Sequence, residues 1–252
     1  MAEAQATVRP ARTVAGARLG QKPIVSMVLI AINLAFFLVT ALQARSAMDL
    51  SPSALYIQGS LIPAEVASGE YWRLLTAGFL HANLIHIATN MISLYILGLP
   101  LERILGRTRF LLIYLLSLLG SSVSVMLFSG PFIPTIGASG AIYGLMGALV
   151  VTFKRLGFDL RQLLVVIALN VFITFQVAGI SWQGHLGGLV VGAVVGAAMV
   201  YPPQNVRKQW QWGTVIGVLV VLAGLVMIRN GQLGEWYCVF DAVGNGRCTQ
   251  VN

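Results

Sequence analysis

Residues 135–144 read Thr135-Ile136-Gly137-Ala138-Ser139-Gly140-Ala141-Ile142-Tyr143-Gly144 and set one serine among small residues at the start of an apolar segment. Glycine allows backbone turns and close approaches that larger residues forbid, so this setting leaves a serine hydroxyl open to a substrate. Small residues beside serine are also ordinary packing in membrane helices. The stretch alone therefore leaves two interpretations, a nucleophile or a helix-packing face, and polar residues elsewhere decide between them.

The composition is that of a membrane protein. Of 252 residues, 57% are hydrophobic and only 10% are charged, and the mean hydropathy is +0.82. A soluble domain of this size has too much surface to cover with so few charges, and apolar runs of this length are typical of transmembrane helices. We predict an all-α polytopic membrane protein with seven spans, at roughly 24–43, 79–99, 110–128, 138–153, 162–180, 184–201 and 212–228.

The net charge of +8 does not indicate nucleic-acid binding, because the basic residues lie singly near the ends of spans. Twelve Lys and Arg residues fall on one set of connections and four (Arg45, Arg73, Arg229 and Arg247) on the other. By the positive-inside rule the N-terminus is cytoplasmic and the C-terminus is outside. We expect the chain in a bacterial plasma membrane.

Four regions follow from these spans. Residues 1–23 are predicted to be a flexible cytoplasmic tail, 24–201 the membrane core, 202–229 a loop with an extra helix, and 230–252 an extracytoplasmic tail. The long outer connection 44–78 mixes apolar and aromatic residues, so we expect a compact, partly helical element at the membrane interface. Proline and arginine at Pro100-Leu101-Glu102-Arg103 predict a turn that closes the second span.

Three polar side chains are predicted to share one depth. His86, Ser139 and His185 lie 16, 16 and 17 residues before the inner ends of spans that run in the same direction, marked by Glu102, Arg155 and Pro202. At 1.5 Å per residue each lies about 24–26 Å above the cytoplasmic face of a core about 30 Å thick. Three helices would thus bring a serine and two histidines together just below the outer surface.

This combination favours nucleophilic catalysis. A serine hydroxyl needs a base, and histidine is the usual one. His86 and Asn90 lie four apart on one helix face, where both can donate hydrogen bonds to an oxyanion, although such residues also join helices. No carboxylate lies at this depth, so we expect a Ser–His dyad.

Other kinds of site fit less well. His81 and His86 are five apart and point in different directions around a helix, which disfavours a three-histidine zinc site, so we expect no metal or cofactor and a structural role for His81. The G-x-S-x-G elbow of soluble hydrolases fails at Ala141. Cys238 and Cys248 lie in the outer tail, where an oxidising compartment permits a disulfide.

Over roughly residues 24–201 the chain resembles the rhomboid intramembrane serine proteases. The resemblance rests on several motifs together: the GxSG motif at Gly137-Ala138-Ser139-Gly140, the histidine segment Gly184-His185-Leu186-Gly187-Gly188, the second-helix pattern of His81, His86 and Asn90, the pair Trp72-Arg73, and Tyr143. The extra seventh span is similar to the six-plus-one subset of that family.

The resemblance implies roles for these residues. Ser139 would be the nucleophile and His185 the base and later the acid. His86, Asn90 and the Ser139 backbone N–H would form the oxyanion hole. Tyr143, Gly137 and Gly140 would support the site.

We therefore expect a rhomboid-like six-helix bundle with a seventh helix, acting as an endopeptidase on transmembrane protein substrates within the lipid bilayer. The alternatives are a catalytically inactive relative that binds membrane clients and, from another class, a transporter or channel. Intact Ser139, His185 and Asn90 argue against the first. The lack of paired intramembrane acids and of inverted repeats argues against the second. The sequence does not indicate an oligomeric state.

Overall fold

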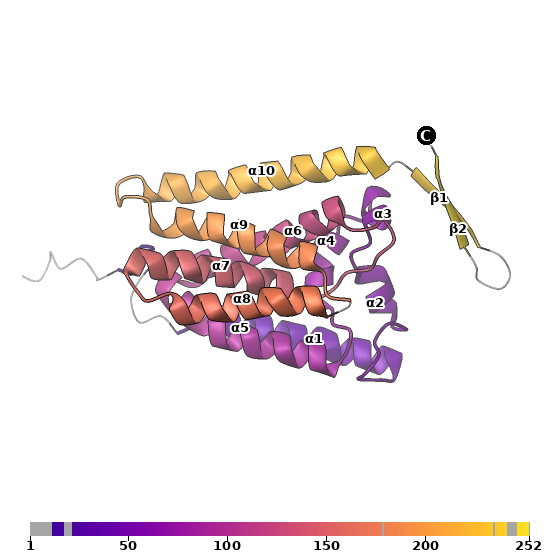
Figure 1. Cartoon of the computed structure of the whole chain (residues 1–252), viewed down its shortest axis with the longest axis horizontal. Coiled ribbons are helices and arrows are strands. Elements are labelled where there is room, and N and C mark those ends of the chain that lie inside the picture. The colour runs from indigo at the N-terminus through magenta and orange to yellow at the C-terminus, as the bar shows by residue number, and fades with distance from the viewer. Residues whose placement is uncertain (1–11, 18–21, 178, 234, 241–245, 252) are drawn as a thin grey trace, which may run out of the picture.

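The computed structural model describes residues 12–17, 22–177, 179–233, 235–240 and 246–251, with side chains as far as residue 233. The long helices are α1 (Val25–Ala44), α5 (Leu84–Leu105), α6 (Arg107–Phe128), α7 (Ser139–Leu156), α8 (Arg161–Gln176), α9 (Trp182–Val200) and α10 (Arg207–Leu233). They run side by side along the long axis of the molecule (Figure 1). The predicted all-α polytopic class is confirmed, with a short β-hairpin, β1 (Glu235–Phe240) and β2 (Gly246–Val251), after the last helix.

Five helices in the described part of the chain are long and apolar enough to cross a membrane: α1, α5, α6, α9 and α10. The 16-residue α8 is shorter, and the 18-residue α7 is less apolar and ends on Lys154 and Arg155. Neighbouring helices surround α7, so that most of its side chains are buried against protein. A helix in that position can hold polar and small residues that a lipid-facing helix cannot.

A row of small residues joins α7 to α9. The glycines Gly188, Gly192 and Gly196 are spaced four apart in the sequence and form one face of α9, which packs closely on α7. A Cβ on Gly188 or Gly192 would overlap the backbone of Gly140 or Gly144, respectively. Only glycine allows this approach, which sets the distance between the two helices that carry Ser139 and His185.

The predicted turn at 100–103 is wrong. The helix α5 continues through Pro100 to Leu105 and ends at Gly106, whose φ of 83° lies in the region that glycine favours. Transmembrane helices tolerate an interior proline, so Pro100 was a poor stop signal. The Glu102 side chain instead caps α1, accepting hydrogen bonds from the backbone N–H groups of Val25 and Ser26 and from the Ser26 hydroxyl at 2.7–2.9 Å.

The two ends of the chain also differ from the predictions. Residues 12–17 of the predicted flexible tail pack against the core, where Ala15 is fully buried, while 1–11 and 18–21 lie outside the described residues. The last helix extends five residues beyond the predicted 212–228 at each end, because polar residues continue a helix beyond the apolar run. The strands β1 and β2 lie within residues 230–252, for which the sequence predicted only a polar outer tail.

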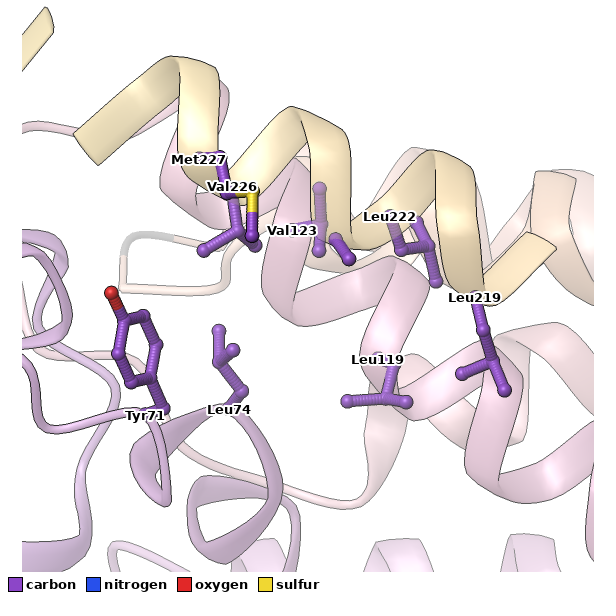
Figure 2. A pocket seen from close by; sticks show the side chains of 9 residues that line it. Tyr71, Leu74, Leu119, Val123, Leu219, Leu222, Val226 and Met227 are labelled. Atoms are coloured by element: carbon purple, nitrogen blue, oxygen red, sulfur yellow. The ribbon is translucent and has the colours of Figure 1, made fainter. Parts of the chain in front are cut away.

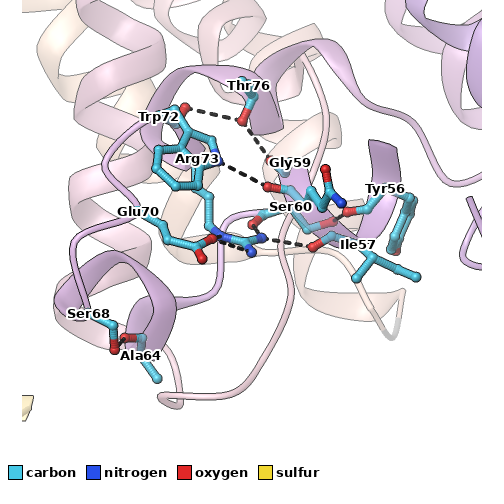
Figure 3. Close-up of polar contacts among 11 residues, drawn as sticks. Tyr56, Ile57, Gly59, Ser60, Ala64, Ser68, Glu70, Trp72, Arg73 and Thr76 are labelled. Atoms are coloured by element: carbon cyan, nitrogen blue, oxygen red, sulfur yellow. Dashed lines mark hydrogen bonds and ion pairs between the residues drawn. The ribbon is translucent and has the colours of Figure 1, made fainter. Parts of the chain in front are cut away.

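The outer connection between α1 and α5 is a compact element. It holds three short helices, α2 (Ala54–Gly59), α3 (Pro63–Ala67) and α4 (Arg73–Thr76), and a 3₁₀ turn, η2 (Ala77–Phe79). The buried Arg73 holds it together: its guanidinium donates to the carbonyl oxygens of Ile57 and Ser60 at 2.9 and 2.8 Å and pairs with Glu70 at 2.6 Å (Figure 3).

The same element supports the segment that leads to Ser139. Leu61 and Thr135 form a two-way backbone bridge, with N–H to O distances of 3.0 and 2.9 Å. Gly137 N–H donates to the Ala77 carbonyl at 2.9 Å. The outer connection thus fixes the backbone just before the α7 N-terminus.

The seventh helix packs on α6 and α9, where the Arg229 guanidinium donates to the Met126 carbonyl at 2.8 Å. An apolar pocket lies between α10, α6 and the outer connection (Figure 2). Its lining consists of Tyr71, Leu74, Leu119, Val123, Leu219, Leu222, Ala223, Val226 and Met227. None of the predicted site residues lines it, so α10 contributes packing at a distance from them.

Candidate active site

Ser139 and His185 lie in contact near the first turns of two neighbouring helices. Ser139 is the first residue of α7, and His185 is the fourth residue of α9. The Ser139 Oγ and the His185 Nε2 are 2.8 Å apart, a hydrogen-bonding distance. Ser181 caps α9 by accepting the Gly184 N–H at 3.2 Å, which fixes the turn that carries His185.

Tyr143 lies one turn after Ser139 and stacks on His185. The two ring centroids are 4.0 Å apart and the ring planes are 15° from parallel. Because Tyr143 belongs to the same helix as Ser139, this stacking holds the imidazole at a fixed height over the serine. This contact is consistent with the supporting role that the resemblance implies for Tyr143.

A residue that the sequence analysis missed contacts the other side of the imidazole. Thr174 on α8 lies with its Oγ1 2.8 Å from the His185 Nδ1 and 2.7 Å from the Tyr143 hydroxyl, and it donates to the Asn170 carbonyl at 2.9 Å. Its side chain is buried, with 5% of the residue exposed. Both ring nitrogens of His185 therefore have a hydroxyl partner, Ser139 on one side and Thr174 on the other.

His86 approaches Ser139 from α5. Its Nδ1 accepts the Ala82 N–H at 3.4 Å, which leaves the Nε2 as the protonated nitrogen of a neutral ring. That Nε2 lies beside Gly137: a Cβ built on Gly137 would be 2.8 Å from it and 3.6 Å from the Ser139 Oγ. The missing side chain, at a φ of 121°, thus leaves a space between a donor and the serine hydroxyl.

Asn90 lies one turn below His86 and is buried. One of its two amide protons goes to the His86 carbonyl oxygen at 2.8 Å, which leaves the other for a second acceptor. The buried His81 contacts the His86 ring edge-on, with the ring centroids 5.0 Å apart. Asn83, which precedes α5, caps it by accepting the His86 N–H at 2.9 Å.

The α7 N-terminus adds backbone donors. Because a helix leaves the N–H groups of its first turn unpaired, the positive end of α7 points toward the region occupied by the Ser139 side chain. Gly140 lies on the opposite side, where a Cβ would overlap Ser121 of α6. Its contribution is the close packing of α7 between α6 and α9.

Together, the geometry brings Ser139, His185, Tyr143, His86 and Gly137 into one group. This arrangement can remove the proton of the serine hydroxyl through His185 and present the His86 Nε2–H to a negative charge that forms near Gly137.

Comparisons with known proteins show the family of this chain. Residues 68–202 match the family model described as the Rhomboid domain. The rhomboid protease GluP of Bacillus subtilis (strain 168) is 36% identical over 186 residues, which are 72% of this chain and 36% of GluP. The chain thus spans only about a third of the length of that relative.

Two further relatives match over more of their own length. The mitochondrial RHOMBOID-like protein 6 of Arabidopsis thaliana is 35% identical over 221 residues, covering 75% of this chain and 70% of the relative. The rhomboid protease AarA of Providencia stuartii is 26% identical over 211 residues, covering 72% and 74%. With a domain match over more than half of its length and a relative that is 35% identical and covered over 70% of that relative's length, the chain belongs to the rhomboid family.

Proposed function

We propose that this protein is an intramembrane serine endopeptidase that cleaves peptide bonds in or next to transmembrane segments of other membrane proteins. The proposal rests on the distance of 2.8 Å between the Ser139 Oγ on α7 and the His185 Nε2 on α9. The rhomboid proteases among its relatives support the reaction type.

In this proposal the Ser139 Oγ attacks the carbonyl carbon of the substrate while its proton passes to the His185 Nε2. The carbonyl oxygen becomes an oxyanion beside Gly137, where the His86 Nε2–H, the free amide proton of Asn90 and the Ser139 backbone N–H donate to it. The imidazolium then returns its proton to the leaving amine. A water molecule, deprotonated by His185, attacks the acyl-enzyme and restores the serine.

The predicted depth of the site indicates where a substrate would be cut. With the N-terminus cytoplasmic and the C-terminus outside, Ser139 lies about 4–6 Å below the outer edge of the hydrocarbon. A substrate helix hides its peptide bonds, so its outer end must unwind before cleavage, which glycine there would ease. We expect cuts near the outer border of the substrate's span, in a bacterial plasma membrane.

A fluorophosphonate probe on the purified, detergent-solubilised protein tests the proposal. The wild type should be labelled and should cleave a model transmembrane substrate, whereas Ser139→Ala and His185→Ala should do neither and should retain their helical content. Mass spectrometry of the products then gives the cut position. Near-normal turnover by Ser139→Ala would refute the serine mechanism, and cuts at the cytoplasmic end of the span would refute the topology.

A further inference from the structure

The proposed mechanism leaves one polar contact of His185 without a role, the contact of its Nδ1 with the Thr174 hydroxyl. Thr174 is the one buried side chain of α8. The rest of that helix is largely exposed, with Leu164, Val165, Val166, Leu169, Phe172, Ile173 and Phe175 among its exposed apolar side chains. Leu163 and Ile167 of α8 are partly buried against the core, and the one buried side chain of the helix contacts the imidazole of His185.

The contacts of Thr174 determine which protons lie where. A hydroxyl has one proton to donate and two lone pairs to accept with. The Asn170 carbonyl oxygen, 2.9 Å away, can only accept, so the threonine proton belongs there. With the threonine proton assigned to that contact, the Tyr143 hydroxyl at 2.7 Å and the His185 Nδ1 at 2.8 Å both act as donors to the threonine oxygen.

This assignment fixes the tautomer of His185. If the Nδ1 carries the proton, the Nε2 of the neutral ring has a free lone pair, and that nitrogen faces the Ser139 Oγ at 2.8 Å. With the threonine proton on the Asn170 carbonyl, the opposite tautomer would set two lone pairs against each other at Thr174, with an O to N distance of 2.8 Å.

Building on the proposed function, we propose that Thr174 is a positioning residue: its hydroxyl holds His185 as the Nδ1–H tautomer, in place of the carboxylate that does this in a Ser–His–Asp triad. When His185 takes the proton of Ser139, the Nδ1–H continues to donate to the same oxygen, so no group has to move. The neutral hydroxyl stabilises the imidazolium less than a carboxylate does, and its removal should cost less than the loss of a triad aspartate.

The variant Thr174→Val tests this with nearly the same volume and no hydroxyl. We expect kcat and the rate of fluorophosphonate labelling to fall about 10- to 100-fold, below the roughly 10⁴-fold loss for a triad aspartate, with KM changed little. Thr174→Ser keeps the hydroxyl and should recover most of the rate. Thr152→Val is the matched control, because Thr152 is equally buried on α7 and donates to the carbonyl four residues back, at 2.7 Å, away from His185.

A spectroscopic measurement tests the tautomer without any substrate. The chain has three histidines, so in ¹⁵N-histidine-labelled wild type the His185 signals are those missing from His185→Ala. We expect a protonated Nδ1 in the wild type and in Thr174→Ser. An unprotonated Nδ1 in the wild type would overturn the proposal, and this spectrum remains decisive if Thr174→Val does not fold.

The two proposals fail differently. A wild type that neither reacts with the fluorophosphonate nor cleaves the substrate contradicts the proposed function. A wild type that does both, with Ser139→Ala inactive but Thr174→Val as fast as Thr152→Val, overturns the role of Thr174 alone.

Discussion

The close contact between α7 and α9 can be tested by adding a single methyl group to one of its glycines. In Gly192→Ala, the new Cβ would overlap the carbonyl oxygen, the carbonyl carbon and the Cα of Gly144. These are backbone atoms and cannot rotate away, so the two helices must separate locally. Gly217→Ala on α10 is the matched control, because a Cβ there has nothing within 4 Å.

The expected magnitude follows from two opposing effects. Overpacking a close contact costs about 1–3 kcal/mol, and we take the upper end because backbone blocks relaxation. Alanine is favoured over glycine within a helix by about 1 kcal/mol. Gly192→Ala should therefore lose about 2 kcal/mol of folding free energy, whereas Gly217→Ala should gain up to about 1 kcal/mol.

Unfolding of the purified variants in the same detergent measures this difference. Gly192→Ala should also lose activity, because the contact between α7 and α9 sets the distance between Ser139 and His185. Gly217→Ala should keep its activity, because α10 carries neither residue. Equal stability of Gly192→Ala and Gly217→Ala would refute the close approach of α7 and α9.

Three further predictions follow. Asn90→Ala should lower kcat about 100-fold with little change in KM, as expected for an oxyanion donor; steady-state kinetics that show a raised KM and an unchanged kcat would make it a binding or packing residue. Cys238 and Cys248 face each other in the register of β1 and β2, although their side chains lie outside the described part. We predict a disulfide between them, and two thiols that react with a labelling reagent before reduction would contradict it. Glu102→Ala should lower stability by about 2–3 kcal/mol because it leaves the buried Ser26 donors unpaired, and Glu102→Gln, which keeps one acceptor oxygen, should lower it less; unchanged unfolding of Glu102→Ala would refute the cap.

The proximity of the serine and the histidines could be predicted because helices convert sequence distance into height along the bundle. Counted to the observed ends of α5, α7 and α9, the distances are 105 − 86 = 19, 156 − 139 = 17 and 200 − 185 = 15 residues. The spread of four residues corresponds to about 6 Å along a helix. The three side chains still meet, because helices can end at different heights while their reactive turns align.

The contact of Thr174 with His185 could not be predicted in this way. A threonine in a membrane helix commonly donates to the carbonyl four residues back, as Thr174 does to Asn170, so its presence predicts nothing further. The apolar residues of α8 also show no clear periodicity, since nearly all of that helix faces outward. Its inward face consists of Thr174 and the partly buried Leu163 and Ile167, and only the packed structure shows that these three residues face the core.

The helices that carry the site are also the ones that resemble membrane spans least. Among the helices of membrane-spanning length, α5 and α9 are less apolar than α1, α6 and α10, and α7 is less apolar still. The histidines, the asparagine and the glycines lower the hydropathy of α5 and α9, and in α7 Lys154 and Arg155 of the last turn add to the effect of the serine and the glycines. Such helices remain in the bilayer because the more apolar ones shield them, as α6 and α8 do for α7. In this chain, a dip in hydropathy between strongly apolar spans is therefore a better indicator of the catalytic helices than the spans themselves.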